Sequence, residues 1–392
     1  MRPSLSPDIW QLFTDGYEVR VTEASHLVVS HVPYLNGDGR EAYGQLVSTI
    51  RWEGDVASYD GQHVAYFVGG VPCDRAGQPL HKLIHEPNPN PNCLEAGLVP
   101  AVGMSSKPEG NYRDYHHKMT TYLDMISVHA RALNPAATAI TNPLLVNDDP
   151  TGPFEYLDGA SSKAGVSIIA DKLRLPKVVI VGLGGTGSYV LDLIAKAPIA
   201  AIHLYDGDDL FTHNAFRAPG AVSLDVLRTR PKKVEYLQGV YSKMKRNIVA
   251  HPEDVDESTV EELRDADFVF LTMEGNETKR MIVGRLTEYG VPFIDVGVGL
   301  TIVNNALLGT VQTITRTPAN TDRTPGRHPI AYDSPPDDVY ETNIQIADLN
   351  MLNAALAVIK WKKLCGFYHD TDDEHYSAYT IEWNQLINED LP

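Results

Sequence analysis

A glycine-rich segment near the middle of the chain has the residue spacing of a phosphate-binding loop. An apolar run from Val178 to Val181 is followed by Gly182, Gly184 and Gly187 in the pattern GxGxxG. Glycine lets the backbone turn sharply and approach phosphate oxygens closely, and the helix that follows such a loop offers unpaired N–H groups to an anion. The pattern therefore favours a nucleotide-binding site over a tight turn with a purely structural role in the hydrophobic core.

An acidic residue ends the next predicted strand, Ala201–Asp206. An acid in this place can hydrogen-bond the hydroxyls of a ribose. The glycine loop and Asp206 by themselves fit NAD and ATP equally well.

The residues beyond Asp206 distinguish the two nucleotides, because Asp208, Asn214, Arg217 and Lys233 follow in order. A dehydrogenase needs no cationic cluster there, whereas an adenylating enzyme must neutralise a triphosphate and the charge that develops at its α-phosphorus. An arginine fork and a lysine point charge supply that neutralisation, and a carboxylate is needed to hold Mg²⁺. Taken singly, Asp208 and Asn214 could be turn residues and Arg217 a surface charge; their order favours ATP.

These motifs, GxGGxGS followed by D-x-D-x5-N-x2-R and then K-V-E, resemble the ubiquitin-activating-enzyme superfamily that includes ThiF, MoeB and HesA. The resemblance covers about residues 160–366. It implies an α/β fold with a Rossmann-like, mostly parallel sheet and helices on both faces. It also implies Mg²⁺- and ATP-dependent adenylation of the C-terminal carboxylate of a ubiquitin-like or sulfur-carrier-like protein. The implied nucleotide-binding residues are Gly182, Gly184, Gly185, Thr186, Gly187, Asp206, Asp208, Asn214, Arg217 and Lys233.

The same resemblance implies a role for most of these side chains. Asp206 binds the ribose, while Asp208, Asn214 and Arg217 line the phosphate site. Lys233 stabilises the phosphate that is transferred. Related proteins form homodimers with composite sites, and the bacterial members that this chain resembles have an extra N-terminal domain and act beside ubiquitin-like and conjugating-enzyme-like partners.

The chain departs from the family pattern at the metal site and at a helix before the glycine loop. The family usually has an aspartate after the strand equivalent to Phe268–Thr272, and here Glu274 is the best substitute as the Mg²⁺ ligand, with Asn276 as the alternative. The family often supplies an arginine to its partner subunit's site, and here Lys163 or, less well, Arg174 could take that role.

A third departure is that no cysteine lies between Gly182 and Leu364. Thioester-forming members carry one near the crossover loop, which we place at Thr315–Glu341. Two interpretations follow, of which the first is favoured: the adenylate passes directly to a partner, or a hydroxyl such as that of Ser334, with His328 as the base, forms an oxyester. Among the three thiols of the chain, Cys365 suits a buried position. Cys93, in a Pro/Asn-rich loop, is the more accessible candidate.

The elements that must position these residues form a domain preceded by a smaller one. Residues 1–150 are predicted to be an α+β domain for substrate or partner recognition, 142–160 a linker, 160–366 the adenylation domain, and 367–392 an acidic extension. The expected strands are Tyr17–Val21, Leu27–His31, Gln45–Ile50, Val64–Val68, Lys177–Val181, Ala201–Asp206, Phe268–Thr272, Phe293–Val298, Thr310–Ile314 and an edge strand at Ala378–Trp383. The expected helices are Tyr112–Leu133, Pro231–Asn247, Ser258–Asp265 with a Ser258/Glu261 capping box, Glu277–Tyr289 and Asn343–Leu364.

Composition restricts the class of protein. A net charge of −18 disfavours nucleic acid and anionic membranes as partners, and no apolar run is long enough to predict a membrane span. Three scattered cysteines fit a reducing cytosol, so a cytoplasmic protein is expected. An NAD(P)-dependent oxidoreductase and a degenerate nucleotide-binding scaffold remain the alternatives.

Overall fold

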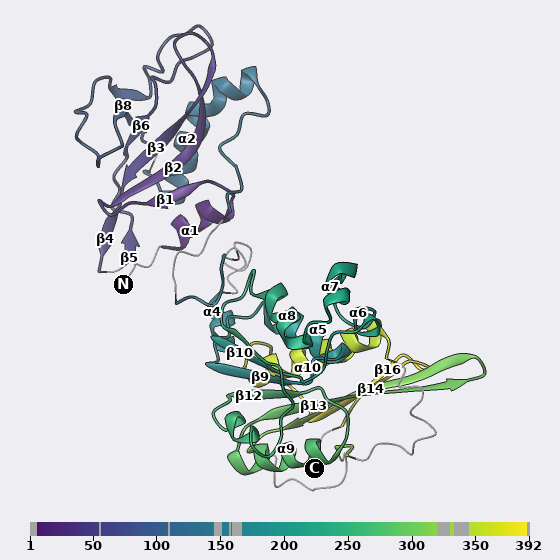
Figure 1. The fold of residues 1–392 in the computed structure, drawn as a ribbon. Coiled ribbons are helices and arrows are strands. Elements are labelled where there is room, and N and C mark those ends of the chain that lie inside the picture. The colour runs from purple at the N-terminus through teal and green to yellow at the C-terminus, as the bar shows by residue number, and fades with distance from the viewer. Residues whose placement is uncertain are drawn as a thin grey trace. The chain divides into compact units, whose positions relative to one another are not determined.

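A computed structural model describes residues 6–54, 56–108, 110–144, 151–156, 158, 167–319, 330–332 and 345–389. The chain forms two compact units (Figure 1). Unit 1 contains residues 1–145 and 158–166, and unit 2 contains residues 146–157 and 167–392.

Unit 1 is built on an antiparallel sheet with the strand order β1-β2-β3-β6-β8-β7. Helices α1 and α2 pack against one face of this sheet and enclose its main core (Figure 1). The Asp114 carboxylate caps α2 by accepting a hydrogen bond from the His117 backbone N–H at 2.7 Å. The elements are α1 (Pro7–Thr14), β1 (Val19–Val21), β2 (His26–Leu35), β3 (Glu41–Thr49), β4 (Arg51–Glu53), β5 (Val56–Ser58), β6 (Val64–Val68), β7 (Ile84–Glu86), β8 (Pro100–Ser105) and α2 (Tyr115–Leu133).

Unit 2 is built on an eight-stranded sheet with the order β11-β10-β9-β12-β13-β14-β15-β16. The first five strands in this order are parallel, and the last three join antiparallel. The chain builds outward from β9 to β10 and β11, and then crosses to the other side of β9 to form β12 and β13. The strand order therefore reverses next to β9, which is where open α/β sheets bind ligands. The strands are β9 (Lys177–Val181), β10 (Ala201–Tyr205), β11 (Ile248–His251), β12 (Phe268–Leu271), β13 (Phe293–Val303), β14 (Ala306–Arg316), β15 (Tyr376–Thr380) and β16 (Gln385–Glu389).

Helices cover both faces of the parallel strands (Figure 1). Because side chains alternate along a strand, Val178 and Ile180 of β9 enter one core with α5, α8 and α10, while Val179 and Val181 enter the other with η2 and α9. This arrangement confirms the Rossmann-like fold that the motifs predicted. The remaining elements are α4 (Ser167–Ala170), η1 (Asp171–Leu173), α5 (Gly185–Ile194), α6 (Thr212–Ala215), α7 (Leu224–Thr229), α8 (Lys233–Tyr241), η2 (Val260–Leu263), α9 (Glu277–Tyr289) and α10 (Ala347–Leu364).

Three sequence predictions for unit 2 are wrong in detail. The helix expected over Pro231–Asn247 ends at Tyr241, and strand β11 begins at Ile248. The helix expected at Ser258 is only the 3-10 turn η2, because the Asp256 carboxylate accepts the Ser258 and Thr259 backbone N–H groups and replaces the expected capping box. The expected edge strand is the interior strand β15, since β16 pairs with its outer side.

No helix in the described part of the chain is long and apolar enough to cross a membrane.

Candidate nucleotide-binding site

A cavity of about 780 Å³ opens at the carboxyl ends of β9 and β12. This volume lies in the range of pockets that hold nucleotide-sized ligands. Its walls come from the glycine loop, the ends of β10, β12 and β13, and the starts of α8 and α9. Of the residues singled out in the sequence, those that line it are Gly182, Gly184, Gly185, Thr186, Asp206, Asp208, Lys233, Glu274 and Asn276.

The glycine loop is held tightly against the end of β12. Gly182 has a φ of +91° and its N–H donates to the Tyr205 carbonyl at 2.8 Å. A Cβ atom on Gly187 would lie only 2.0 Å from the Gly182 carbonyl oxygen, so no side chain fits there. The Thr272 hydroxyl donates to the Val181 carbonyl at 3.1 Å and joins the two strand ends. These glycines are therefore required by the turn itself.

Gly184 differs from its neighbours because its missing side chain faces open space. A Cβ atom placed on it would meet no atom within 4 Å, although Gly184 caps α5 and lines the cavity. A Cβ on the next residue, Gly185, would collide with the buried Asn350 amide at 1.9 Å. The start of α5 is therefore open to an anion on the side of Gly184, whereas Asn350 closes the side of Gly185.

Asp206 fixes the glycine loop from the end of β10. Its Oδ2 accepts the Leu183 backbone N–H at 2.6 Å, and its Oδ1 accepts the Asp208 backbone N–H at 3.0 Å. The residue is 7% exposed, so its negative charge needs a partner. That partner is Lys233, whose Nζ lies 3.3 Å from Asp206 Oδ1.

Lys233 begins α8 and points into the cavity wall, where it is 6% exposed. Its Nζ also pairs with Asp208 Oδ2 at 2.6 Å, and the side chain of Asp208 is 70% exposed. The lysine is therefore held between one fixed carboxylate and one that faces solvent. This geometry leaves the cation available to a phosphate if the exposed carboxylate turns away.

The described residues that line the cavity include neither Asn214 nor Arg217. The Asn214 side chain accepts the Phe211 backbone N–H at 2.8 Å and thus stabilises the start of α6. Arg217 follows α6 and is half-buried. Burial lowers the pKa of His213 in α6, and the positive charges of Arg217 and Lys233 lower it further.

Glu274 lines the cavity as an exposed side chain on the loop after β12. Asn276, the other candidate ligand, uses its side-chain oxygen to cap α9 through the Lys279 backbone N–H at 2.8 Å. No group of three or more His, Cys, Asp or Glu in the described ranges is placed to hold a metal ion. Mg²⁺ bound with a nucleotide needs only one or two carboxylates, because phosphates and water supply the other oxygens. The exposed Glu274 and Asp208 fit that requirement.

The cavity also contains a buried ion pair that was not predicted. Lys279 Nζ lies 2.5 Å from Asp295 Oδ1, and both side chains are almost completely buried. Burial raises the pKa of Asp295 to about 6, although the charge of Lys279 opposes that shift. The sequence signal that could have revealed this pair is the acidic residue Asp295 within the apolar run Phe293–Val298.

Asn350 of α10 was also missed. Its Oδ1 accepts the Thr186 hydroxyl at 3.2 Å, and its Nδ2 lacks a hydrogen-bond partner among the described residues. The residue lines the cavity and is 1% exposed. This buried amide is packed against Gly185, where it leaves no room for a side chain.

Several predicted residues lie outside the part of the chain that the structure describes, namely Lys163, His328 and Ser334. The three cysteines are described. Cys73 is buried and Cys93 exposed, while burial raises the pKa of Cys365 to about 11. Cys93 is therefore the thiol with the best access to solvent.

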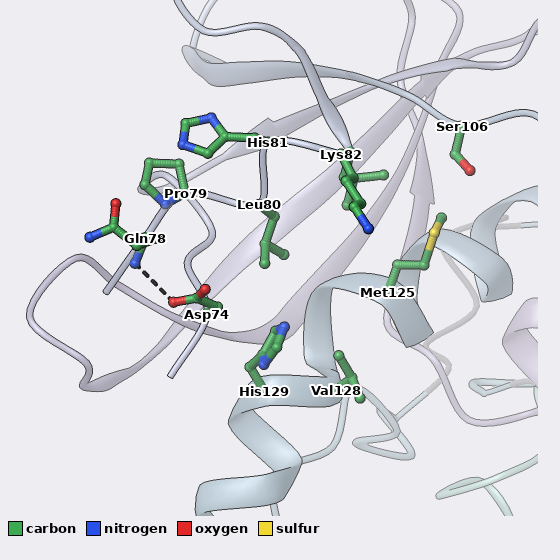
Figure 2. A pocket seen from close by; sticks show the side chains of 11 residues that line it. Asp74, Gln78, Pro79, Leu80, His81, Lys82, Ser106, Met125, Val128 and His129 are labelled. Atoms are coloured by element: carbon green, nitrogen blue, oxygen red, sulfur yellow. Dashed lines mark hydrogen bonds between the residues drawn. The ribbon is translucent and has the colours of Figure 1, made fainter. Parts of the chain in front are cut away.

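A second concavity of about 520 Å³ lies in unit 1, between α2 and the segment Gln78–Leu83 (Figure 2). Its walls combine Leu80, Met125 and Val128 with His81 and His129. The carboxylate that borders it, Asp74, accepts the backbone N–H groups of its own turn, one of which is the contact drawn in Figure 2. Among the described residues, this groove has neither a glycine loop nor a lysine ion pair like those of the cavity in unit 2.

A parallel sheet whose order reverses at β9, with a glycine loop and a helix start at that point, defines a Rossmann-like nucleotide-binding domain. The chain belongs to the ThiF family, whose family model matches residues 161–359. Residues 7–159 match a domain of unknown function, DUF6791. The family resemblance read from the motifs is thereby confirmed.

Solved structures with a similar chain include MccB and PaaA. E. coli MccB with ATP is 18% identical, with a TM-score of 0.44, and the match covers 57% of this chain and 66% of that one. The microcin C7 biosynthetic enzyme MccB in complex with N-formylated MccA is 19% identical, with a TM-score of 0.46 over 59% and 70%. PaaA is 15% identical, with a TM-score of 0.42 over 58% and 76%. The chain thus spans about two thirds of the length of MccB, and no curated protein matches it.

Proposed function

We propose that this protein uses Mg·ATP to adenylate the C-terminal carboxylate of a ubiquitin-like protein. The observation that carries the proposal is that Gly184 and Lys233 line the same cavity. The open approach at Gly184 suits a phosphate at the start of α5. The buried lysine suits charge that develops at phosphorus, and a dinucleotide dehydrogenase has no use for it.

In the proposed reaction a carboxylate oxygen of the substrate attacks the α-phosphorus of ATP. A new P–O bond forms, the bond between the α-phosphorus and the bridging oxygen breaks, and pyrophosphate leaves. The N–H groups of α5 and the Lys233 ammonium stabilise the charge on the phosphorus oxygens. Asp208 turns to solvent as the phosphate takes its place on Lys233. Glu274 would hold Mg²⁺, which would supply positive charge to the triphosphate.

The family resemblance extends the proposal to partners. It supports a homodimer with composite sites and a conjugating-enzyme-like protein that receives the activated substrate, with unit 1 as the recognition unit. Arg217 is proposed to reach the phosphates from the end of α6. Without a cysteine in the crossover loop, the adenylate passes directly to the partner. An oxyester on Ser334 is the alternative, and intact-mass spectrometry identifies it as an adduct that survives thiol reductant but not mild base.

ATP–pyrophosphate exchange tests the proposal. The purified chain is incubated with ATP, Mg²⁺ and each of a panel of ubiquitin-like proteins that end in glycine. We expect exchange that depends on one of them and that falls at least 100-fold in Lys233→Ala. Glu274→Gln should raise the Mg²⁺ concentration needed for half-maximal exchange. Its matched control is Glu277→Gln, a nearby exposed carboxylate that does not line the cavity.

Two results would contradict the proposal. One is thermal stabilisation by NAD but not by ATP, which would favour an oxidoreductase. The other is ATP binding with no exchange in the presence of any protein of the panel. This result would have to be combined with an unchanged phenotype of cells in which the Lys233→Ala or Arg217→Ala variant replaces the wild-type protein. That second result would favour a nucleotide-binding scaffold.

A further inference from the structure

The groove of unit 1 lies between helix α2 and a turn at residues 80–83 (Figure 2). In this turn the Leu83 and Ile84 backbone N–H groups donate to the Leu80 carbonyl at 2.8 and 2.9 Å. The turn is also tied to the chain on both sides. The Leu80 N–H donates to the Pro72 carbonyl at 2.9 Å, and the Ser105 N–H donates to the Leu83 carbonyl at 3.0 Å. The wall that faces α2 is therefore fixed by backbone hydrogen bonds.

The walls of the groove are apolar and partly open to solvent. Leu80 comes from the turn and is half-buried, while Met125 and Val128 are three residues apart on α2 and share one face of that helix. Val128 is 50% exposed. Pockets for small molecules enclose most of their ligand, whereas a groove with one open wall suits an apolar anchor residue of a bound peptide. The volume of about 520 Å³ admits a few side chains.

Lys82 gives this groove a positive charge that no described carboxylate neutralises. Its side chain points from the turn toward α2 (Figure 2), and it makes no ion pair or hydrogen bond with a residue that the structure describes. Asp74 lines the groove, but its Oδ1 accepts two backbone N–H groups of its own turn at 2.8 and 2.9 Å. Asp124 of α2 pairs with Arg131 at 2.8 Å and does not line the groove. In a chain with 51 acidic and 33 basic residues, Lys82 is thus left for an external anion.

The two ends of the groove differ in charge. The hydrogen bond from the Gln78 backbone lowers the pKa of Asp74, and the nearby His129 and His81 lower it further. Figure 2 shows Asp74 and His129 at one end of the groove and Lys82 at the other. The lysine end is the one without an acid, so it favours an acidic group of a ligand.

We infer that this groove binds an acidic segment of a partner protein through one bulky apolar anchor residue. The anchor lies between Leu80 of the turn and Met125 and Val128 of α2. An aspartate or glutamate within about two positions of the anchor reaches Lys82, because a peptide rises about 3.3 Å per residue. The site belongs to unit 1 alone and does not depend on the proposed adenylation.

This chemistry defines which segments the groove accepts. A small residue in place of the anchor would leave the apolar surface of Val128 in water. A basic residue in place of the acid would be repelled by Lys82. Binding should also weaken as salt is added, since Lys82 is exposed and its attraction to an acid is screened.

The test uses four labelled peptides with the full chain. Each is a fluorescein-labelled peptide of glycine and serine, with Glu-Leu-Glu, Gln-Leu-Gln, Lys-Leu-Lys or Glu-Ala-Glu at its centre. Fluorescence anisotropy at low salt measures the Kd, and NMR of chain labelled with ¹³C-methyl methionine reports on Met125. We expect the Glu-Leu-Glu peptide to have a Kd at least threefold lower than that of each of the other three, and to shift the Met125 methyl signal.

Variants of the groove test its charge. Lys82→Glu should reverse the preference, so that the Lys-Leu-Lys peptide binds more tightly than the Glu-Leu-Glu peptide. Arg51→Glu makes the same change of charge at an exposed residue of β4 outside the groove, and it should leave the preference as in wild type.

A second pair of variants tests the apolar wall. Val128→Asp should raise the Kd of the Glu-Leu-Glu peptide at least fivefold. Leu133→Asp is the matched control, because Leu133 is 55% exposed on the same helix and does not line the groove. It should change this Kd less than twofold.

Several results would overturn the inference. They are binding of none of the four peptides, equal Kd values for the acidic and basic peptides, and equal effects of Val128→Asp and Leu133→Asp. Binding of Glu-Ala-Glu as tight as that of Glu-Leu-Glu would show attraction by charge alone and would also overturn it. Because no peptide experiment requires ATP, these outcomes leave the adenylation proposal to its own test.

Discussion

Replacing Gly184 and Gly187 one at a time should separate nucleotide binding from folding. A Cβ on Gly184 would meet no atom within 4 Å, and its φ of −71° suits any residue. We expect Gly184→Ala to change the free energy of unfolding by less than about 1 kcal/mol. A Cβ on Gly187 would lie 2.0 Å from a backbone oxygen that cannot move aside. Gly187→Ala should therefore lower the free energy of unfolding by about 3 kcal/mol.

The effect on ATP should follow from the space that Gly184 leaves open. A methyl group there would block at least one hydrogen bond from α5 to a charged phosphate, a contact that contributes about 1.5–3 kcal/mol. The Kd for ATP should rise about 10- to 150-fold. Isothermal titration calorimetry measures the Kd, and urea unfolding measures the stability. An unchanged ATP affinity in Gly184→Ala would refute the position assigned to the phosphates, and wild-type stability in Gly187→Ala would refute the packing argument.

Three further predictions concern charges and thiols. Lys233→Met leaves the buried Asp206 without its cation, so the free energy of unfolding should fall by about 1–3 kcal/mol. Equal Tm values of Lys233→Met and wild type in thermal unfolding would contradict a stabilising role of the ion pair. Because burial raises the pKa of Asp295 to about 6, the folded chain holds a proton that the unfolded chain releases near pH 4. The free energy of unfolding contributed by this residue should therefore fall as the pH rises from about 4 to 6, and urea unfolding of Asp295→Asn across that range should show a smaller decrease than wild type. Maleimide labelling followed by peptide mass spectrometry should modify Cys93 well before Cys365, whose thiol is partly buried and has a raised pKa; the reverse order would show that the loop around Cys93 is covered.

The local motifs could be interpreted from the sequence because their physics is local. A glycine loop between an apolar strand and a helix has few other uses, and Gly182 does adopt the positive φ that such a turn needs. The family, the fold class and part of the cavity lining follow from that loop and from the spacing of Asp206, Asp208 and Lys233. The parallel strands were likewise visible as apolar runs.

The strand prediction that failed depended on contacts between distant residues. Strand β11 is short and half-buried, and it is recognisable only through its pairing with β10. The Asn214 side chain caps α6, because a short polar side chain hydrogen-bonds nearby backbone groups, and its role at the phosphates stays a prediction.

By itself, the sequence determined the glycine loop, the order of the acids and the lysine after it, and the class of fold that holds them, since steric and charge patterns act over a few residues. Tertiary structure decided which side chains share the cavity. It brought Lys279 to Asp295 and set Asn350 of α10 against the loop. Strand register and helix packing fix these neighbours, and both depend on burial across the whole unit.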